Sequence, residues 1–107
     1  MRYWSVVVPG LPAQAMALYP FMLFKNSKLK LDNRLIRHEQ IHFKQQLELL
    51  IVFFYILYLL NYLINLVRFR KHDKAYFQIC FEKEAYQNDH DLEYMKNRKL
   101  FSWIKLI

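Results

Sequence analysis

The stretch "RHEQIHFKQQLELLIVFFYILYLLNYLINLV", residues 37–67, joins two patterns that decide the fold. It contains no glycine or proline, so nothing in it interrupts an α-helix. Its first part is polar and places His38 and His42 four residues apart, with Glu39 between them. Its second part, residues 49–67, is almost entirely apolar. The sequence therefore predicts a helix that starts with a histidine pair and runs into an apolar segment.

The composition of the whole chain favours a small, mainly helical domain. A length of 107 residues predicts a single domain over 1–107, and 55% apolar residues exclude a disordered chain. The single glycine and the three prolines all lie in the first twenty residues, so long helices are expected after them. The fold class is therefore mainly α, with α+β also possible because of the N-terminal segment.

Residues 1–30 are predicted to form strands or an interfacial segment. Residues 3–8, "YWSVVV", are aromatic and β-branched and are followed by "PGLP", which is typical of a short strand and its end. Residues 16–25 are a second strand candidate, and Pro20 within them favours an edge strand or a bulge. A signal peptide is disfavoured because the apolar run before the small residues is short and contains prolines.

Two helices and a tail are expected in the rest of the chain. Asp32 or Asn33 can cap a helix over residues 33–67, which includes the histidine pair and the apolar segment. A polar loop follows, and residues 74–96 form a second helix candidate, antiparallel to the first. Residues 97–107 mix cations with leucine, isoleucine, phenylalanine and tryptophan, which is typical of an interfacial tail.

The formal charge of +7 indicates an anionic partner. The cations form three clusters, each next to a strongly apolar segment, which suits anionic lipid headgroups better than a nucleic-acid groove. Nucleic acid is disfavoured as a partner because the chain has no helix-turn-helix, zinc-finger or RNP signature. The predicted location is a membrane surface, at the cytoplasmic face of the inner membrane.

The spacing of His38 and His42 predicts a zinc site. On a helix, residues four apart lie on one face, so both imidazoles can reach one Zn²⁺ ion. Glu39 points slightly aside and need not bind the metal. It can instead take a proton from a water molecule that the zinc holds and acidifies, so we expect it to act as a general base.

A third zinc ligand is expected from the region downstream, where several residues are candidates. Helical spacing places Glu82, Ala85, Tyr86 and Asp89 on one face, and the small Ala85 would allow close approach to the first helix. Glu84 points away from that face and is expected to be solvated, although it remains an alternative ligand. The remaining candidates are Cys80, His72 and His90.

The pair of motifs "HEQIH" and "EKEAY" resembles the gluzincin branch of zinc metallopeptidases, and the chain is also similar to a group of short bacterial proteins with an HExxH motif. The resemblance implies His38, His42 and Glu82 as ligands and Glu39 as base. It departs from the family at Tyr86, where gluzincins often place a second-shell Asp or Asn, and Asp89 is the expected substitute.

The apolar segment conflicts with this site if it crosses a membrane once. Residues 49–67 are about 28 Å long as a helix, so His42 and Glu82 would end on opposite sides. A helical hairpin associated with the membrane removes the conflict. Its reversal is expected either near Asn61, midway between the two ligands, or in the polar loop 68–73.

Two functions follow from the sequence. The first is a membrane-associated zinc hydrolase, a minimal metallopeptidase acting on peptides or proteins, with Tyr86 or His90 as stabilisers of the oxyanion. The second is a non-catalytic small membrane protein or a subunit of a larger membrane assembly, with at most a structural metal site. The glutamate inside HExxH favours the first function, and the short chain favours the second.

Overall fold

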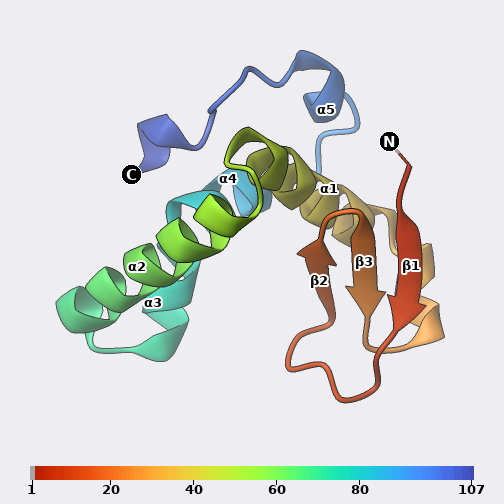
Figure 1. The fold of residues 1–107 in the computed structure, drawn as a ribbon, viewed down its shortest axis with the longest axis horizontal. Helices are drawn as coiled ribbons and strands as arrows, with labels where there is room; N and C mark the ends of the chain where they lie inside the picture. The colour runs from red at the N-terminus through yellow and green to blue at the C-terminus, as the bar shows by residue number, and fades with distance from the viewer. Residues whose placement is uncertain (1) are drawn as a thin grey trace.

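A computed structural model describes residues 2–107 as a small sheet followed by a mainly helical body (Figure 1). The strands are β1 (Trp4–Val7), β2 (Ala15–Leu18) and β3 (Phe21–Phe24). The central strand β3 pairs parallel with β1 and antiparallel with β2, so β2 is an edge strand. The strand predicted over residues 16–25 is thus a hairpin, because Tyr19 and Pro20 form its turn.

The first long helix, α1 (Asn33–Glu48), follows the 3-10 turn η1 (Ser27–Leu31) and carries the histidine pair. Asp32 caps it by accepting a hydrogen bond from the Leu35 backbone N–H at 3.1 Å. One side of α1 packs on the sheet through Phe43, which lies with Met22 and Phe24 in a fully buried cluster. The sheet therefore fixes the orientation of α1.

The helix predicted over residues 33–67 is divided in two. After α1 the chain turns at Leu50 and Ile51, whose φ angles are 58° and 62°, and then continues as α2 (Val52–Phe69). Left-handed conformations cost non-glycine residues about 1–2 kcal/mol each. Sequence propensity does not predict such a break, so the packing of α1 and α2 against different partners must outweigh this cost.

The chain reverses after α2 at Arg70 and Lys71, inside the predicted polar loop and not near Asn61. Arg70 adopts the left-handed conformation with φ of 60°. The helices α3 (His72–Phe77) and α4 (Cys80–Asn88) then return along α2, as Figure 1 shows. The second predicted helix, residues 74–96, is accordingly split into α3, α4 and the short α5 (Tyr94–Asn97).

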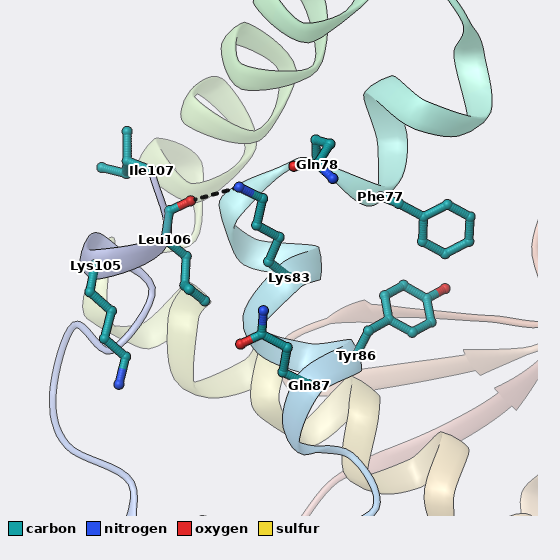
Figure 2. Close-up of a pocket in the computed structure, with 8 residues that line it drawn as sticks. All are labelled: Phe77, Gln78, Lys83, Tyr86, Gln87, Lys105, Leu106 and Ile107. Carbon is teal, nitrogen blue, oxygen red and sulfur yellow. Dashed lines mark hydrogen bonds between the residues drawn. The ribbon is translucent and has the colours of Figure 1, made fainter. Parts of the chain in front are cut away.

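The C-terminal tail ends in the 3-10 turn η2 (Ile104–Leu106) and packs on α4. Trp103 is buried against Phe81, with ring centroids 4.9 Å apart, in a cluster that also holds Phe54. Lys83 donates a hydrogen bond to the Leu106 carbonyl at 3.1 Å, beside a shallow pocket (Figure 2). The tail predicted to be interfacial is therefore in part a component of the core, although several of its apolar side chains are exposed.

Candidate metal centre

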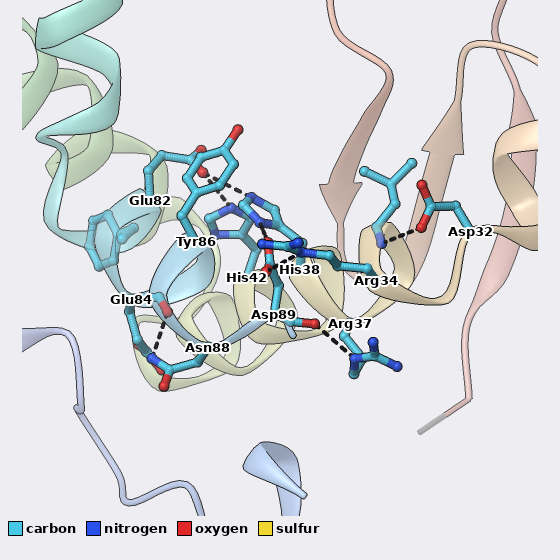
Figure 3. Close-up of polar contacts among 12 residues, drawn as sticks. Asp32, Arg34, Arg37, His38, His42, Glu82, Glu84, Tyr86, Asn88 and Asp89 are labelled. Carbon is cyan, nitrogen blue, oxygen red and sulfur yellow. Dashed lines mark hydrogen bonds and ion pairs between the residues drawn. The ribbon is translucent and has the colours of Figure 1, made fainter. Parts of the chain in front are cut away.

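The two predicted motifs meet where α1 and α4 cross (Figure 3). Nε2 of His38 lies 3.0 Å and Nε2 of His42 lies 3.1 Å from the same oxygen, Oε1 of Glu82. The three ligand atoms lie within 4.8 Å of one another, and each residue is no more than 5% exposed. The structure thus brings together the two histidines and the glutamate that helical spacing placed on facing sides of two helices.

Gln45 determines which nitrogen of His42 carries the proton. The Gln45 amide nitrogen donates to the Phe81 carbonyl and to Glu84 Oε1, both at 3.0 Å, and both partners can only accept. Its amide oxygen therefore faces Nδ1 of His42 at 2.7 Å and must receive a hydrogen from it. With the proton on Nδ1, Nε2 of His42 presents a lone pair towards Glu82.

Asp89 holds His38 in the same way. Nδ1 of His38 lies 3.0 Å from Asp89 Oδ2, and a carboxylate is an acceptor, so this nitrogen also carries a proton. Arg34 Nε donates to Asp89 Oδ1 at 2.8 Å, and Arg37 Nε donates to the Asp89 carbonyl at the same distance. Asp89 therefore orients His38, the role that the sequence assigned to it as the substitute for Tyr86.

These contacts leave three acceptors facing one another without a donor. The lone pairs of both Nε2 atoms converge on Glu82 Oε1, while Tyr58 donates to Oε2 of the same carboxylate at 2.6 Å. Three converging lone pairs repel unless a proton or a cation lies between them. The two Nε2 atoms and Oε1 are therefore arranged around a position for a positive charge that the protein itself does not supply.

The pKa values of His42 and Glu82 also indicate that the site favours a positive charge. Burial alone would lower the pKa of His42, but the Glu82 carboxylate outweighs it and raises this pKa to about 9. Burial alone would raise the pKa of Glu82, but His42 and His38 outweigh it and hold this pKa well below its usual range. The metal-free site therefore stabilises an additional proton, which a metal ion would replace.

The geometry fits zinc. Zinc bonds of about 2.0–2.1 Å in a tetrahedron place neighbouring ligand atoms about 3.3 Å apart, close to the 3.0 Å and 3.1 Å found between Nε2 and Oε1. Two imidazole nitrogens and one carboxylate oxygen are three of the four ligands of such a site. His38, His42 and Glu82 can thus hold the ion and leave one position open.

Glu39 lies beside this cluster and lines a cavity of about 360 Å³. Burial raises the pKa of the Glu39 carboxyl, and the nearby His42 and His38 reduce this effect without reversing it. The cavity is bounded by the start of β2, the first turns of α1 and the rings of Tyr76 and Tyr86. Glu39, which the sequence predicts as the base, is therefore placed next to a space large enough for part of a substrate.

The other candidate residues lie outside the ligand set. Glu84 is not solvated as expected, because it is 1% exposed and forms an ion pair with Arg98 instead of facing the histidines. His90 is exposed, and its side chain has no polar contact within residues 2–107. Tyr86 stacks its ring edge-on to His38 at 4.4 Å between centroids. Cys80 is buried in the core beside Phe81, and His72 pairs with a tyrosine of α2.

Two residues of the site were missed from the sequence. Gln45 lies one helical turn after His42 on the same face, so its spacing was a usable signal. Tyr58 lies on α2, and nothing in its sequence neighbourhood points to Glu82.

Comparisons with protein-family models, with curated proteins and with solved structures each return no match. The gluzincin resemblance therefore depends on the two motifs alone.

Proposed function

We propose that this protein is a membrane-associated, zinc-dependent hydrolase, a minimal metallopeptidase in which Glu39 is the general base. The observation that carries the proposal is the convergence of three acceptor atoms, from His38, His42 and Glu82, next to a buried carboxylate in a cavity. A site that only stabilised the fold would not need Glu39 beside it.

The chemistry follows from the positions of these side chains. When bound, zinc supplies Lewis-acid activation of water and of a substrate carbonyl. Glu39 accepts the proton of the attacking water and then donates it to the leaving amine, and its raised pKa makes the carboxylate a stronger base. Asp89 and Gln45 keep the histidines in the tautomer that binds metal. Tyr86, at the edge of the cavity, is better placed than the exposed His90 to stabilise an oxyanion.

The edge strand β2 supports a peptide as the substrate. Successive backbone groups of a strand alternate between its two edges. The carbonyl of Ala17 points to the free edge, since it accepts hydrogen bonds from Tyr55 and Gln46 and not from β3. Ala15, two residues earlier, directs its N–H and C=O to the same edge and lines the cavity. An extended peptide can pair there, which would bring its backbone next to Glu39.

The membrane part of the proposal is supported by α2. Within the described residues, α2 is the one helix that is both long enough and apolar enough to cross a bilayer. Only Phe54 and Asn65 along it are buried. We infer an association with the cytoplasmic face of the inner membrane, since the net charge of +7 matches its anionic lipids.

A structural metal site is the second candidate function. Tyr58 occupies the second oxygen of Glu82, and an ion at this position would tie α1 to α4. This arrangement also suits a subunit of a larger membrane assembly.

The Glu39→Gln variant tests the catalytic role. The amide keeps the size of the side chain but cannot accept a proton, so zinc content and folding should be retained while peptide hydrolysis falls by about 10²–10⁴-fold. His38→Ala should lose both zinc and activity. Zinc content is measured by metal analysis, and hydrolysis is measured with a peptide library in lipid and in detergent.

The exposed Glu93 provides a matched control, since Glu93→Gln removes a carboxylate that does not line the cavity and should change neither readout. A wild-type protein that binds zinc but cleaves no peptide under either condition would replace the catalytic proposal with the structural one.

A further inference from the structure

One side of α2 is a continuous apolar surface, which we name the outer face. Ten exposed side chains form it, from the corner before α2 to its last turn: Leu50, Val52, Phe53, Ile56, Leu57, Leu59, Leu60, Leu63, Ile64 and Val67. At 100° per residue, the nine that belong to α2 cover an arc of about 160°. No polar side chain interrupts this arc.

Every polar side chain between residues 50 and 67 lies outside this arc and is hydrogen-bonded to another part of the protein. These side chains are Tyr55, Tyr58, Asn61, Tyr62 and Asn65. A helix at the surface of a water-soluble protein has the opposite arrangement, with its apolar side inward and its polar side in water. The polarity of α2 is therefore inverted, which indicates that its outer face contacts an apolar medium.

The two asparagines form hydrogen bonds with backbone groups of the segment that packs on α2. Asn61 Oδ1 accepts from the Cys80 N–H at 2.8 Å, and Asn65 Nδ2 donates to the Ala75 carbonyl at 3.1 Å. The Ala75 carbonyl lies in the last turn of α3 and the Cys80 N–H in the first turn of α4, where helix ends leave such groups without helical partners. Satisfying them internally matters most where water is scarce.

Charge favours a lipid bilayer over a second copy of the chain as the partner of the outer face. Arg68, Arg70 and Lys71 are all exposed at the C-terminal end of α2, directly beyond the apolar arc. A net charge of +7 makes two copies repel each other, whereas it attracts each copy to anionic headgroups.

The packing of α3 and α4 decides how α2 lies in the bilayer. α3 packs at the C-terminal end of α2, where Lys74 lies over the Phe69 ring, and Tyr58 of α2 donates to Glu82 of α4. If α2 crossed the bilayer, the contact of Tyr58 would hold Glu82 and the two histidines at the depth of the hydrocarbon, which is strongly unfavourable. With α2 parallel to the membrane plane, the outer face meets the acyl chains while α3 and the cations remain at headgroup level.

We propose that α2 is an in-plane membrane anchor, with its outer face buried in the interface of an anionic bilayer and the metal centre held just above it. Tyr58 connects the anchor to the centre, because it belongs to α2 and donates to Glu82. This inference deepens the membrane part of the proposed function and does not depend on the zinc chemistry.

Vesicle co-sedimentation of the full chain tests the outer face. The protein should bind vesicles of phosphatidylcholine with phosphatidylglycerol. The double variant Leu60→Asn/Ile64→Asn should lower the partition coefficient by at least ~10-fold, because it removes two apolar side chains from the interface. The matched control is Leu31→Asn/Leu92→Asn, which makes the same change at two highly exposed positions outside the outer face and should bind as the wild type does.

The cations are tested by lipid composition. Arg68→Gln/Lys71→Gln should reduce the preference for anionic over neutral vesicles, whereas Lys25→Gln/Lys28→Gln, at exposed positions before α1, should not. Zinc content is measured on every variant. Loss of lipid binding with zinc retained separates a failure of the anchor from a failure of the metal site.

Nitroxide labels at Val52, Leu59 and Val67, in a Cys80→Ala background, distinguish an in-plane helix from a crossing one. An in-plane helix gives three equal, shallow depths in vesicles. A crossing helix places Leu59 near the bilayer centre and the two ends at opposite surfaces, which would overturn the proposal. A wild-type protein that remains soluble without lipid and does not bind vesicles would also overturn the proposal, whether it is a monomer or a dimer joined through the outer face.

Discussion

Glu82 and Glu84 are two residues apart on α4, and both are buried, yet their surroundings differ. Glu84 contacts the Arg98 guanidinium, which it shares with Glu48, and also accepts from Gln45 and Tyr94. Glu82 faces two histidines and a tyrosine hydroxyl and, within residues 2–107, forms no ion pair with a lysine or arginine. One carboxylate therefore receives its positive charge from the chain, and the other must obtain it from a proton or a metal ion.

This difference separates a structural carboxylate from a binding one more clearly than burial does. Arg98 and its hydrogen bonds outweigh burial and hold the pKa of Glu84 below its usual range, and no further ligand is needed. Around Glu82, by contrast, three acceptor atoms from His38, His42 and Glu82 converge without a positive charge from the chain between them. Gln45 touches both sides, because its amide connects His42 with Glu84.

The largest expected effect is on the Glu84 side. Arg98→Met removes the guanidinium and leaves two buried carboxylates unpaired, so the free energy of unfolding should fall by about 3–5 kcal/mol, measured by chemical denaturation. Lys96→Met, which removes a cation from an exposed pair with Glu93, should change it by less than about 1 kcal/mol. Equal effects of the two variants would mean that Glu84 does not depend on its built-in cation.

The next effect concerns zinc. Glu82→Gln should lower zinc affinity by at least ~10²-fold, since four-ligand sites gain about 10–16 kcal/mol in total and one ligand is lost. Glu84→Gln should leave the affinity unchanged within about 10-fold, because it acts on the metal only through Gln45. Competition with a chelator of known affinity measures both. The reverse result would assign the third ligand to Glu84.

A smaller effect is expected at the residue that connects the two sides. Gln45→Met keeps the volume but removes the acceptor for His42 Nδ1, so zinc affinity should fall by about 10–100-fold.

Gln46→Met is the matched control for this change. Gln46 is equally buried but binds Ala17 and Tyr19 of the β2–β3 hairpin, so its loss should lower stability without affecting zinc. An unchanged affinity in Gln45→Met would show that the tautomer of His42 is set without Gln45.

The remaining effect is a difference in the pH dependence of stability. In the metal-free protein the pKa of His42 is raised from 6.5 to about 9, so its contribution to stability is complete below pH 6.5 and is lost as the pH rises through about 9. The pKa of Glu84 is lowered from 4.5, so its contribution is present above pH 4.5 and is lost on acidification. Unfolding curves measured across this range should show both losses.

Saturating zinc should abolish the alkaline loss, because the ion replaces the proton between Nε2 and Oε1, and Glu84→Gln should reduce only the acid loss. An alkaline loss that persisted with zinc bound would place the ion elsewhere.

Much of the site could be predicted from the sequence because it depends on local periodicity. The i, i+4 spacing of His38 and His42 and the phase of Glu82 on its own helix are properties of a regular helix. Asp89 was predicted on the same face, and it does orient His38. The prediction that Glu84 is solvated was wrong, since its phase placed it away from the metal but could not reveal that Arg98, fourteen residues later, covers it.

The sequence by itself determined the mainly helical character, the short N-terminal strands and the candidate ligand residues, because each is encoded within a few neighbouring positions. Only the tertiary structure decided the break at Leu50 and Ile51, the choice of the polar loop over Asn61 for the reversal, and the burial of Glu84. Each of these results from a balance between a local cost and contacts formed far along the chain, such as Asn61 with Cys80 or Tyr58 with Glu82. Local propensity cannot show such contacts, because their energy exists only after the helices have packed.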